Sequence, residues 1–164
     1  AGEMTLDDDI VVVRDLIESC AILVRDSVVE KDLHFTTNLA PGISNITADT
    51  RLLRQTVLNL LTNAVKFTDP GGKIGIDVTM TPERAVAFTI TDNGCGIREG
   101  DLVRVLEPFG QVRTRPDLSH DGTGLGLPLA KRFTELHGGT LTLESTFGEG
   151  TTVRVTMPAE RTLA

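Results

Sequence analysis

The apolar residues in the first third of the chain recur at helical spacing in one segment and at strand spacing in three others. Between residues 14 and 31 they lie three or four positions apart, which predicts a helix with an apolar side made of Leu16, Ile17, Cys20, Leu23, Val24 and Val28. A short apolar run precedes this helix at residues 10–13, and two looser runs follow at residues 33–39 and 43–48. These runs predict strands, because they are short and turn residues bound them.

The strongest helical pattern covers residues 50–67, directly after Asp49. Aspartate is a preferred N-cap, because its carboxylate accepts hydrogen bonds from the free amides of the first turn. One side of this helix is apolar and is expected to pack on a sheet through Leu53, Val57, Leu60, Leu61 and Ala64. An Asp-Pro-Gly-Gly sequence ends the helix, and residues 73–80 and 85–92 then predict two strands joined by a turn.

The last part of the chain predicts a short helix near residues 99–106, an irregular stretch over 109–123, a helix over 125–137, and strands at 140–146 and 151–157. Strands and helices are mixed without the strict alternation of a doubly wound fold. We therefore predict an α/β (α+β) two-layer sandwich. In it, one mixed sheet of five or more strands is covered on one face by three main helices.

Length and charge limit the protein classes that fit. The 164 residues suit one domain, expected over residues 10–158, with a C-terminal tail at 159–164. Residues 1–9 are expected to be a disordered leader or vector remnant plus a linker. The formal net charge of -7 argues against binding to nucleic acid or anionic membrane. There is no secretory pattern and no apolar run near ~20 residues, so we expect a cytoplasmic location, which includes the cytosolic part of a membrane-bound receptor.

Asn59, Asn63 and Lys66 are spaced four and three residues apart, so they share one stripe of the helix predicted over 50–67. An amide oxygen is a suitable Mg²⁺ ligand, and a lysine ammonium pairs with phosphate. Taken alone, this spacing is more typical of a solvated polar helix face.

A second motif, Asp92-Asn93-Gly94-Cys95-Gly96-Ile97, directly follows an apolar strand. A carboxylate at a strand end can accept a hydrogen bond from an exocyclic amine. The glycines beside it let the backbone approach a flat ring. Asn-Gly is also a strong turn signal, so a turn and a binding site are equal alternatives for this motif alone.

A third motif, Gly122-Thr123-Gly124-Leu125-Gly126-Leu127, opens the helix predicted over 125–137. Amides at a helix N-terminus can face phosphates. The motif differs from a dinucleotide fingerprint, because Leu127 replaces the third glycine and a polar loop precedes it in place of a strand. It also lacks the lysine of a P-loop.

The irregular stretch before this motif is long for a compact domain, and such loops are usually lids or disordered segments. Arg113 and Arg115 in it either reach phosphates on closure or are simply solvated. Thr151 alternates with the apolar residues of the last strand. It either hydrogen-bonds an adenine or a bridging water near Asp92, or it is satisfied locally. No histidine is assigned a catalytic role, and a helix-end position explains His137.

Together these motifs resemble the catalytic ATP-binding domain of the sensor histidine kinases of two-component signalling. The similarity runs from about residue 10 to 158. The family's N box, G1 box, F box and G2 box, followed by two later features, are similar to residues 55–68, 92–96, 107–109, 122–127, 136–139 and 148–152.

The resemblance implies the Bergerat-type sandwich shared with gyrase-type, Hsp90-type and MutL-type ATPases, and it implies ATP and Mg²⁺ as cofactors. Asp92 would bind the adenine amino group. Asn63, helped by Asn59, would hold Mg²⁺, and Lys66 would meet phosphate. Phe109 would anchor one end of a lid. The remaining implied nucleotide contacts are Phe67, Gly94, Gly96, Ile97, Gly122, Thr123, Gly124, Leu125, Gly126, Leu127 and Thr151.

The resemblance also bears on the phosphoryl acceptor. Related ATPases have Glu, a general base for water, where this chain has Asn59. An amide lacks the basicity to activate water, and a serine acceptor would also need a base. Imidazole, with an ordinary pKa of ~6.5, is largely neutral and nucleophilic at pH 7. Asn59 therefore favours phosphorylation of histidine, with Asn59 and Lys66 as the catalytic residues.

By the same resemblance we expect an excised, monomeric catalytic domain. Its partners would be the histidine-bearing dimerisation domain of the same parent protein and a response regulator receiver domain, with no nucleic acid and no membrane insertion. Two alternatives stay open. One is a kinase-like module of a degenerate kinase that docks signalling partners, and the other, disfavoured by Asn59, is an ATPase. Gln111 stands where simpler family members often have Arg, which changes the expected γ-phosphate contacts.

Overall fold

A computed structural model gives the fold and describes residues 5–107 and 126–163. The strands and long helices are, in chain order, β1 (Asp8–Val11), α1 (Val13–Glu30), β2 (His34–Leu39), β3 (Ile46–Asp49), α2 (Thr50–Phe67), β4 (Lys73–Met80), β5 (Val86–Asp92), α4 (Gly126–Leu136), β6 (Thr140–Thr146) and β7 (Gly150–Met157). Three short 3₁₀ helices are η1 (Glu99–Asp101), η2 (Arg104–Leu106) and η3 (Ala159–Arg161).

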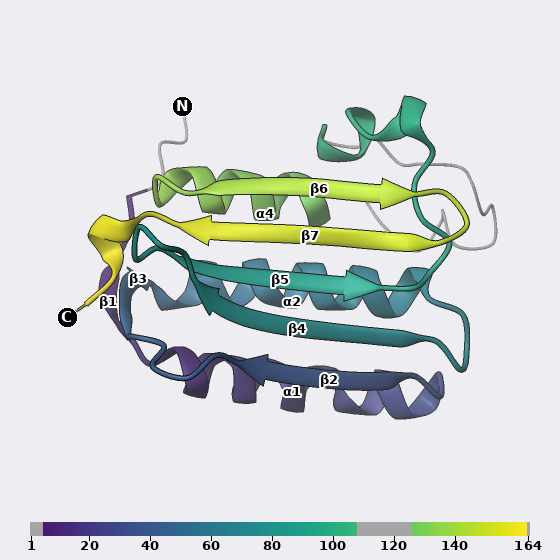
Figure 1. Cartoon of the computed structure of the whole chain (residues 1–164), viewed down its shortest axis with the longest axis horizontal. Helices are drawn as coiled ribbons and strands as arrows, with labels where there is room; N and C mark the ends of the chain where they lie inside the picture. The colour runs from purple at the N-terminus through teal and green to yellow at the C-terminus, as the bar shows by residue number, and fades with distance from the viewer. Residues whose placement is uncertain (1–4, 108–125, 164) are drawn as a thin grey trace.

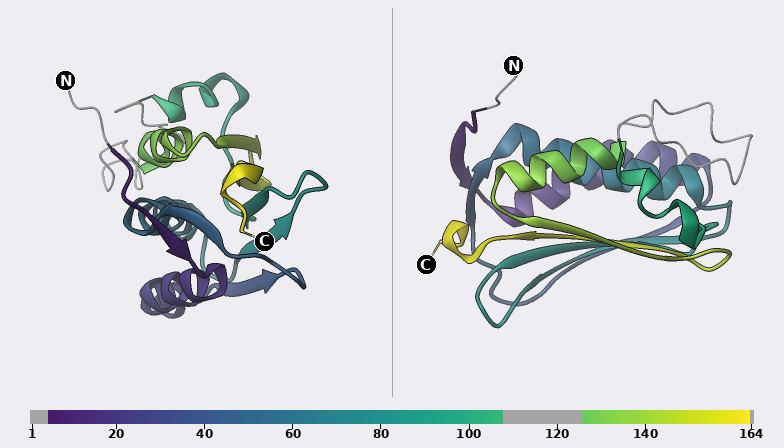
Figure 2. Two further views of the ribbon diagram at one scale, coloured as in Figure 1. Left: turned by 90° about the vertical axis from the view of Figure 1, so that its left-hand side faces the viewer. Right: turned by 90° about the horizontal axis from the view of Figure 1, so that it is seen from above.

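The main sheet has five strands in the order β2-β4-β5-β7-β6. β2 lies parallel to β4, and the other neighbours are antiparallel. β1 and β3 form a separate two-stranded ribbon. The helices α1, α2 and α4 all lie over one face of the main sheet (Figures 1 and 2). The predicted two-layer sandwich with a mixed sheet and three main helices is therefore confirmed.

The hydrophobic core lies between the helices and the sheet. Phe88 of β5 and Leu53 of α2 are fully buried there. α2 begins at the predicted residue, because the Asp49 carboxylate accepts the Leu52 N–H at 3.2 Å. Cys20 of α1 is also fully buried, and this burial raises the pKa of its thiol to about 11. The core thus fixes α2 against the sheet and leaves its opposite stripe free for polar residues.

Observed and predicted elements differ mainly at two places. The apolar run at residues 10–13 divides between two elements, because Val11 and Val13 are buried while Ile10 and Val12 are exposed. β1 consequently begins at Asp8, inside the segment expected to be a leader and linker. The helix predicted over 99–106 is two 3₁₀ turns, in which Val105 alone is buried. One apolar contact is too few to stabilise a longer helix.

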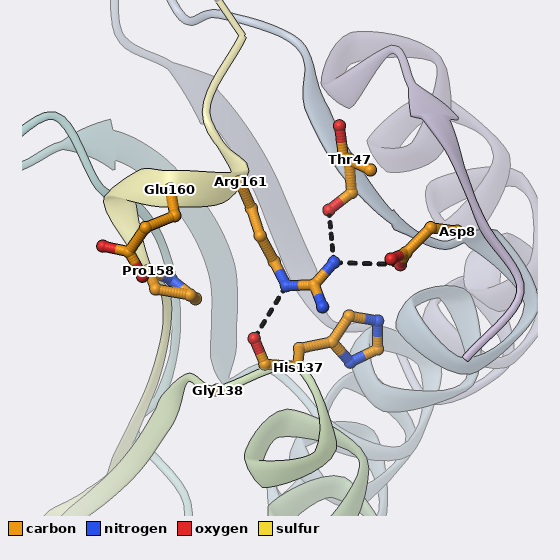
Figure 3. Close-up of a pocket in the computed structure, with 7 residues that line it drawn as sticks. All are labelled: Asp8, Thr47, His137, Gly138, Pro158, Glu160 and Arg161. Carbon is orange, nitrogen blue, oxygen red and sulfur yellow. Dashed lines mark hydrogen bonds and ion pairs between the residues drawn. The ribbon is translucent and has the colours of Figure 1, made fainter. Parts of the chain in front are cut away.

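Arg161 of η3, which follows the end of β7, contacts three other segments of the chain (Figure 3). Its Nε donates to the His137 carbonyl at 2.7 Å, and one terminal nitrogen donates to the Thr47 carbonyl and to Asp8 Oδ1, both at 2.9 Å. A pocket of about 380 Å³ lies around it. Residues 159–163 are therefore held against the domain, and Thr162 adds a bridge to Ile46.

His137 is buried beneath this arginine, with 2% of its surface exposed. Its Nε2 accepts the Asp49 N–H at 3.1 Å, which leaves Nδ1 to donate to the Phe133 carbonyl at 2.7 Å. The ring thus links the end of α4 to the start of α2. That role is structural, and it comes from these two hydrogen bonds as well as from the position at the end of α4.

Candidate nucleotide-binding site

α2 contacts the second motif and Gly126, which belongs to the described end of the third motif. Asn59, Asn63 and Lys66 form the polar stripe of this helix, called here the α2 stripe. Asn59 Nδ2 donates to the Gly126 carbonyl at 3.3 Å, at the first residue of α4. A Cβ on Gly126 would stand 3.4 Å from Asn63 Nδ2. At the other end of α2, the Phe67 carbonyl accepts the Cys95 N–H at 3.1 Å. The second motif and the described end of the third therefore both meet the helix that carries the first.

Both polar atoms of the Asn59 side chain have partners. Its Oδ1 accepts from Gln55 Nε2 at 2.6 Å, and its Nδ2 donates to Gly126. These bonds fix which way the amide points, with the oxygen towards Gln55. The side chain is partly buried at the junction of α2 and α4.

The last turn of α2 carries Lys66 and Phe67, and a lysine directly after α1 holds it in place. Lys31 Nζ donates to the carbonyls of Val65 and Lys66, both at 2.8 Å. A cation at this position also interacts favourably with the negative end of the helix. The Lys66 ammonium lies 5.1 Å from the centre of the Phe67 ring. Lys31 was not predicted as a contributor to this region.

Asp92 ends β5, and its carboxylate is mostly buried. Oδ1 accepts the Gly94 N–H at 2.8 Å, which closes a tight turn. Burial raises the pKa of Asp92, because a buried carboxylate loses hydration, while the N–H groups of Gly94 and Thr151 lower it in part. A carboxylate has room for several donors, so further acceptor positions remain on Asp92.

The glycines beside Asp92 are required by close backbone contacts. A Cβ on Gly94 would collide with the Phe67 carbonyl oxygen and stand 2.9 Å from Asp92 Oδ1. Gly96 has a φ of +71°, and a Cβ there would collide with the Thr146 carbonyl oxygen. The Asn-Gly sequence is therefore a turn. It is also a turn that holds a partly buried carboxylate near the end of α2.

Thr151 of β7 is the cross-strand partner of Asp92. Its hydroxyl lies 2.8 Å from Ser145 Oγ, and Ser145 Oγ also accepts the Ile97 N–H at 2.7 Å. Ser145 was missed by the sequence analysis. The signal that could have identified it is the alternation along β6, where residues 141, 143 and 145 share the less exposed side of the strand.

The structure places only the end of the third motif. Gly126 and Leu127 begin α4, and Leu127 packs against the core. The other predicted lid and phosphate residues lie outside the described residues, namely Phe109, Gln111, Arg113, Arg115, Gly122, Thr123, Gly124 and Leu125.

The fit of a metal ion can be tested on side chains between 5 and 107 and between 126 and 163. These ranges contain no group of three His, Cys, Asp or Glu residues that could hold one. Asn59 and Asn63 nevertheless lie together, and amide oxygens are ligands of the kind that Mg²⁺ uses alongside water and phosphate. The residues thus fit a cation that arrives with phosphates. In the same ranges, no helix is both long enough and apolar enough to cross a membrane.

A family model described as histidine kinase-, DNA gyrase B- and HSP90-like ATPase matches residues 48–161. The chain belongs to this family. The matched range contains the α2 stripe, Asp92 with its glycines, and Thr151. ATP is the nucleotide of this family of domains, so the predicted ATP-binding fold and nucleotide agree with the match.

Several curated relatives are histidine kinases. The chain is 35% identical over 148 residues to an uncharacterized sensor-like histidine kinase of Rhizobium meliloti, covering 90% of this chain and 28% of that protein. It is 45% identical over 116 residues to the circadian input-output histidine kinase CikA of Synechococcus elongatus, covering 71% and 15%. The chain therefore spans less than a third of the length of these relatives.

Solved histidine kinases share the fold. Full-length ShkA in complex with AMPPNP aligns with a TM-score of 0.86 and 27% identity, covering all of this chain and 33% of that one. The mycobacterial sensor histidine kinase MprB aligns with a TM-score of 0.78 and 27% identity, covering 97% and 100%. Sequence and structure together make this a histidine kinase-type catalytic ATP-binding domain.

Proposed function

We propose that this domain binds ATP with Mg²⁺ and donates the γ-phosphoryl group to a histidine on the dimerisation domain of its parent protein, which then passes the group to a response regulator receiver domain. Asp92 would accept hydrogen bonds from the adenine amine. Lys66 would pair with phosphate, and Asn63 with Asn59 would face the metal. Mg²⁺, when bound, would neutralise charge on the phosphates.

The observation that carries this proposal is the state of Asn59. Its amide is bonded to Gln55 and to the Gly126 carbonyl, and an amide lacks the basicity to deprotonate water. A neutral imidazole needs no such base, because its nitrogen lone pair attacks the γ-phosphorus while the bond to the ADP oxygen breaks. Asn59 therefore supports a role in aligning the phosphates for transfer to histidine.

The test mixes this domain with the dimerisation domain of its parent protein and γ-labelled ATP. We expect the label on one histidine, as an acid-labile and alkali-stable phosphoryl group. A dimerisation domain lacking that histidine is the control and should stay unlabelled. ATP binding without labelling would favour the docking module. Steady release of inorganic phosphate without labelling would favour the ATPase.

The amide-based metal contacts predict that Mg²⁺ binds only together with nucleotide. Titration calorimetry should detect no saturable Mg²⁺ binding to the free domain, while Mg²⁺ should strengthen ATP binding. Asn63→Ala is expected to reduce this Mg²⁺-dependent gain by roughly tenfold, because it removes one oxygen ligand. Thr62→Ala, at an exposed neighbouring position on α2, is the matched control. An unchanged gain in Asn63→Ala would remove Asn63 from the metal site.

A further inference from the structure

Asp92, Thr151 and Ser145 form one row across three neighbouring strands. Asp92 of β5 pairs with Thr151 of β7, and Thr151 pairs with Ser145 of β6. Cross-strand partners point to the same side of a sheet. Buried Ile90 and Val153, two residues along from Asp92 and Thr151, identify that side as the helix-covered one. The three side chains thus line the same inner edge of the sheet.

The Ser145 hydroxyl has three close neighbours but only one proton. It accepts the Ile97 N–H at 2.7 Å, and it lies 2.9 Å from the Gly150 carbonyl oxygen, which can only accept. Its own proton therefore points to Gly150. The third contact, 2.8 Å to Thr151 Oγ, is then satisfied only if Thr151 donates. A hydroxyl can donate one hydrogen bond and accept two, so the Ser145 hydroxyl makes all the hydrogen bonds that it can.

This arrangement fixes what Thr151 can offer to a ligand. Its single proton is directed at Ser145, so its oxygen presents lone pairs on the other side. Within the part of the chain that the structure describes, no group donates to Thr151 Oγ. Asp92 in the same row presents carboxylate lone pairs. Two neighbouring acceptors match the two N–H bonds of an exocyclic amine, and they repel a carbonyl oxygen in its place.

We infer that Ser145 is a positioning residue that makes the site selective for 6-aminopurine over 6-oxopurine nucleotides, because it holds the Thr151 hydroxyl as an acceptor. The inference rests on the proposed ATP binding and adds the residue that sets base discrimination. Without the Ser145 oxygen, the Thr151 hydroxyl can turn and donate to a 6-oxo group. A site built around fixed hydrogen bonds discriminates well against a ligand of reversed polarity.

The test compares the dissociation constants of ATP and inosine triphosphate, which carries an oxygen in place of the amine. The wild-type domain should prefer ATP. In Ser145→Ala the preference should fall by roughly tenfold, through weaker ATP binding and stronger inosine triphosphate binding. Ser145→Thr keeps the hydroxyl and should keep the preference. Thr142→Ala, on the exposed side of β6, is the matched control and should leave both constants unchanged.

General loosening of the site would weaken both nucleotides together, whereas the inference requires their ratio to change. An unchanged ratio in Ser145→Ala overturns the inference while leaving ATP binding intact. Absence of ATP binding by the wild-type domain instead overturns the proposed function. If thermal unfolding shows that Ser145→Ala is not folded at the assay temperature, the same ratio of dissociation constants is measured for Ser145→Cys. Its thiol keeps the size but bonds weakly, so its ratio should also fall, and an unchanged ratio there overturns the inference.

Discussion

Replacing Asp92 with asparagine is expected to weaken ATP binding by about tenfold to a hundredfold without lowering the thermal unfolding temperature. A hydrogen bond to a carboxylate is worth ~1.5–3 kcal/mol, and the asparagine NH₂ would bring a donor towards the adenine amine. Stability should be retained, because Asn Oδ1 can still accept the Gly94 N–H at the place where Asp92 Oδ1 does. Calorimetric titration with ATP and thermal unfolding measure the two effects separately.

The pH dependence of the same carboxylate gives an independent check. Burial raises the pKa of Asp92, so it takes up a proton at a higher pH than a free aspartate does. ATP affinity should fall as pH drops through that pKa, and Asp92→Asn should lose this dependence. The free energy of unfolding should change in the opposite direction and increase as pH drops through the same pKa. The ionised buried carboxylate is unfavourable above its raised pKa, and this cost disappears as pH falls through it.

Asp77→Asn, on β4, is the control for these measurements. Asp77 accepts a hydrogen bond from Asn38 Nδ2 at 3.1 Å at an exposed position, and it lies outside the Asp92 row. Its replacement should leave ATP affinity and its pH dependence unchanged. Equal ATP affinity of the wild-type domain and Asp92→Asn would exclude Asp92 from the binding site.

Local signals in the sequence were sufficient for most elements. α2 was predicted over residues 50–67 because an N-cap, a long helical period and a Pro-Gly stop all coincide, and the structure gives the same bounds. Strands β4 and β6 were also predicted to the residue, since turn residues bound them clearly. The two 3₁₀ turns near Gly100 were predicted as one helix. That segment has few apolar residues, so their spacing does not show which of them are buried.

Contacts between segments that are far apart in the chain could not be predicted from the sequence. The strand order and the β5–β7 register, which set Asp92 beside Thr151, depend on how the whole sheet assembles. Lys31 reaches carbonyls that are 34 and 35 residues away, and Ser145 bonds an amide 48 residues away. A lysine after a helix and a serine in a strand carry no local signal of such roles. The motifs predicted the residue types at the site, and the fold supplies the partners that orient them.

Replacing Gly94 with alanine is expected to destabilise the domain by about 2–4 kcal/mol and to weaken ATP binding by more than about tenfold. The new Cβ would collide with the Phe67 carbonyl oxygen, which is backbone at the end of α2 and cannot rotate away. Relief requires the turn to move off α2, which breaks the 3.1 Å bond from the Cys95 N–H to Phe67. Chemical denaturation and calorimetric ATP titration measure the two losses.

Gly100→Ala is the matched control, because a Cβ there meets no atom within 4 Å and the residue is exposed in η1. The two variants add the same methyl group about six residues apart, so they differ only in what that group contacts. Full stability in Gly94→Ala would show that the turn is not packed against α2 as described. Lost stability with intact ATP affinity would mean that the position of this turn does not shape the nucleotide site. That result would show that Gly94 contributes to stability, while ATP binding depends on Asp92 and not on the glycine turn beside it.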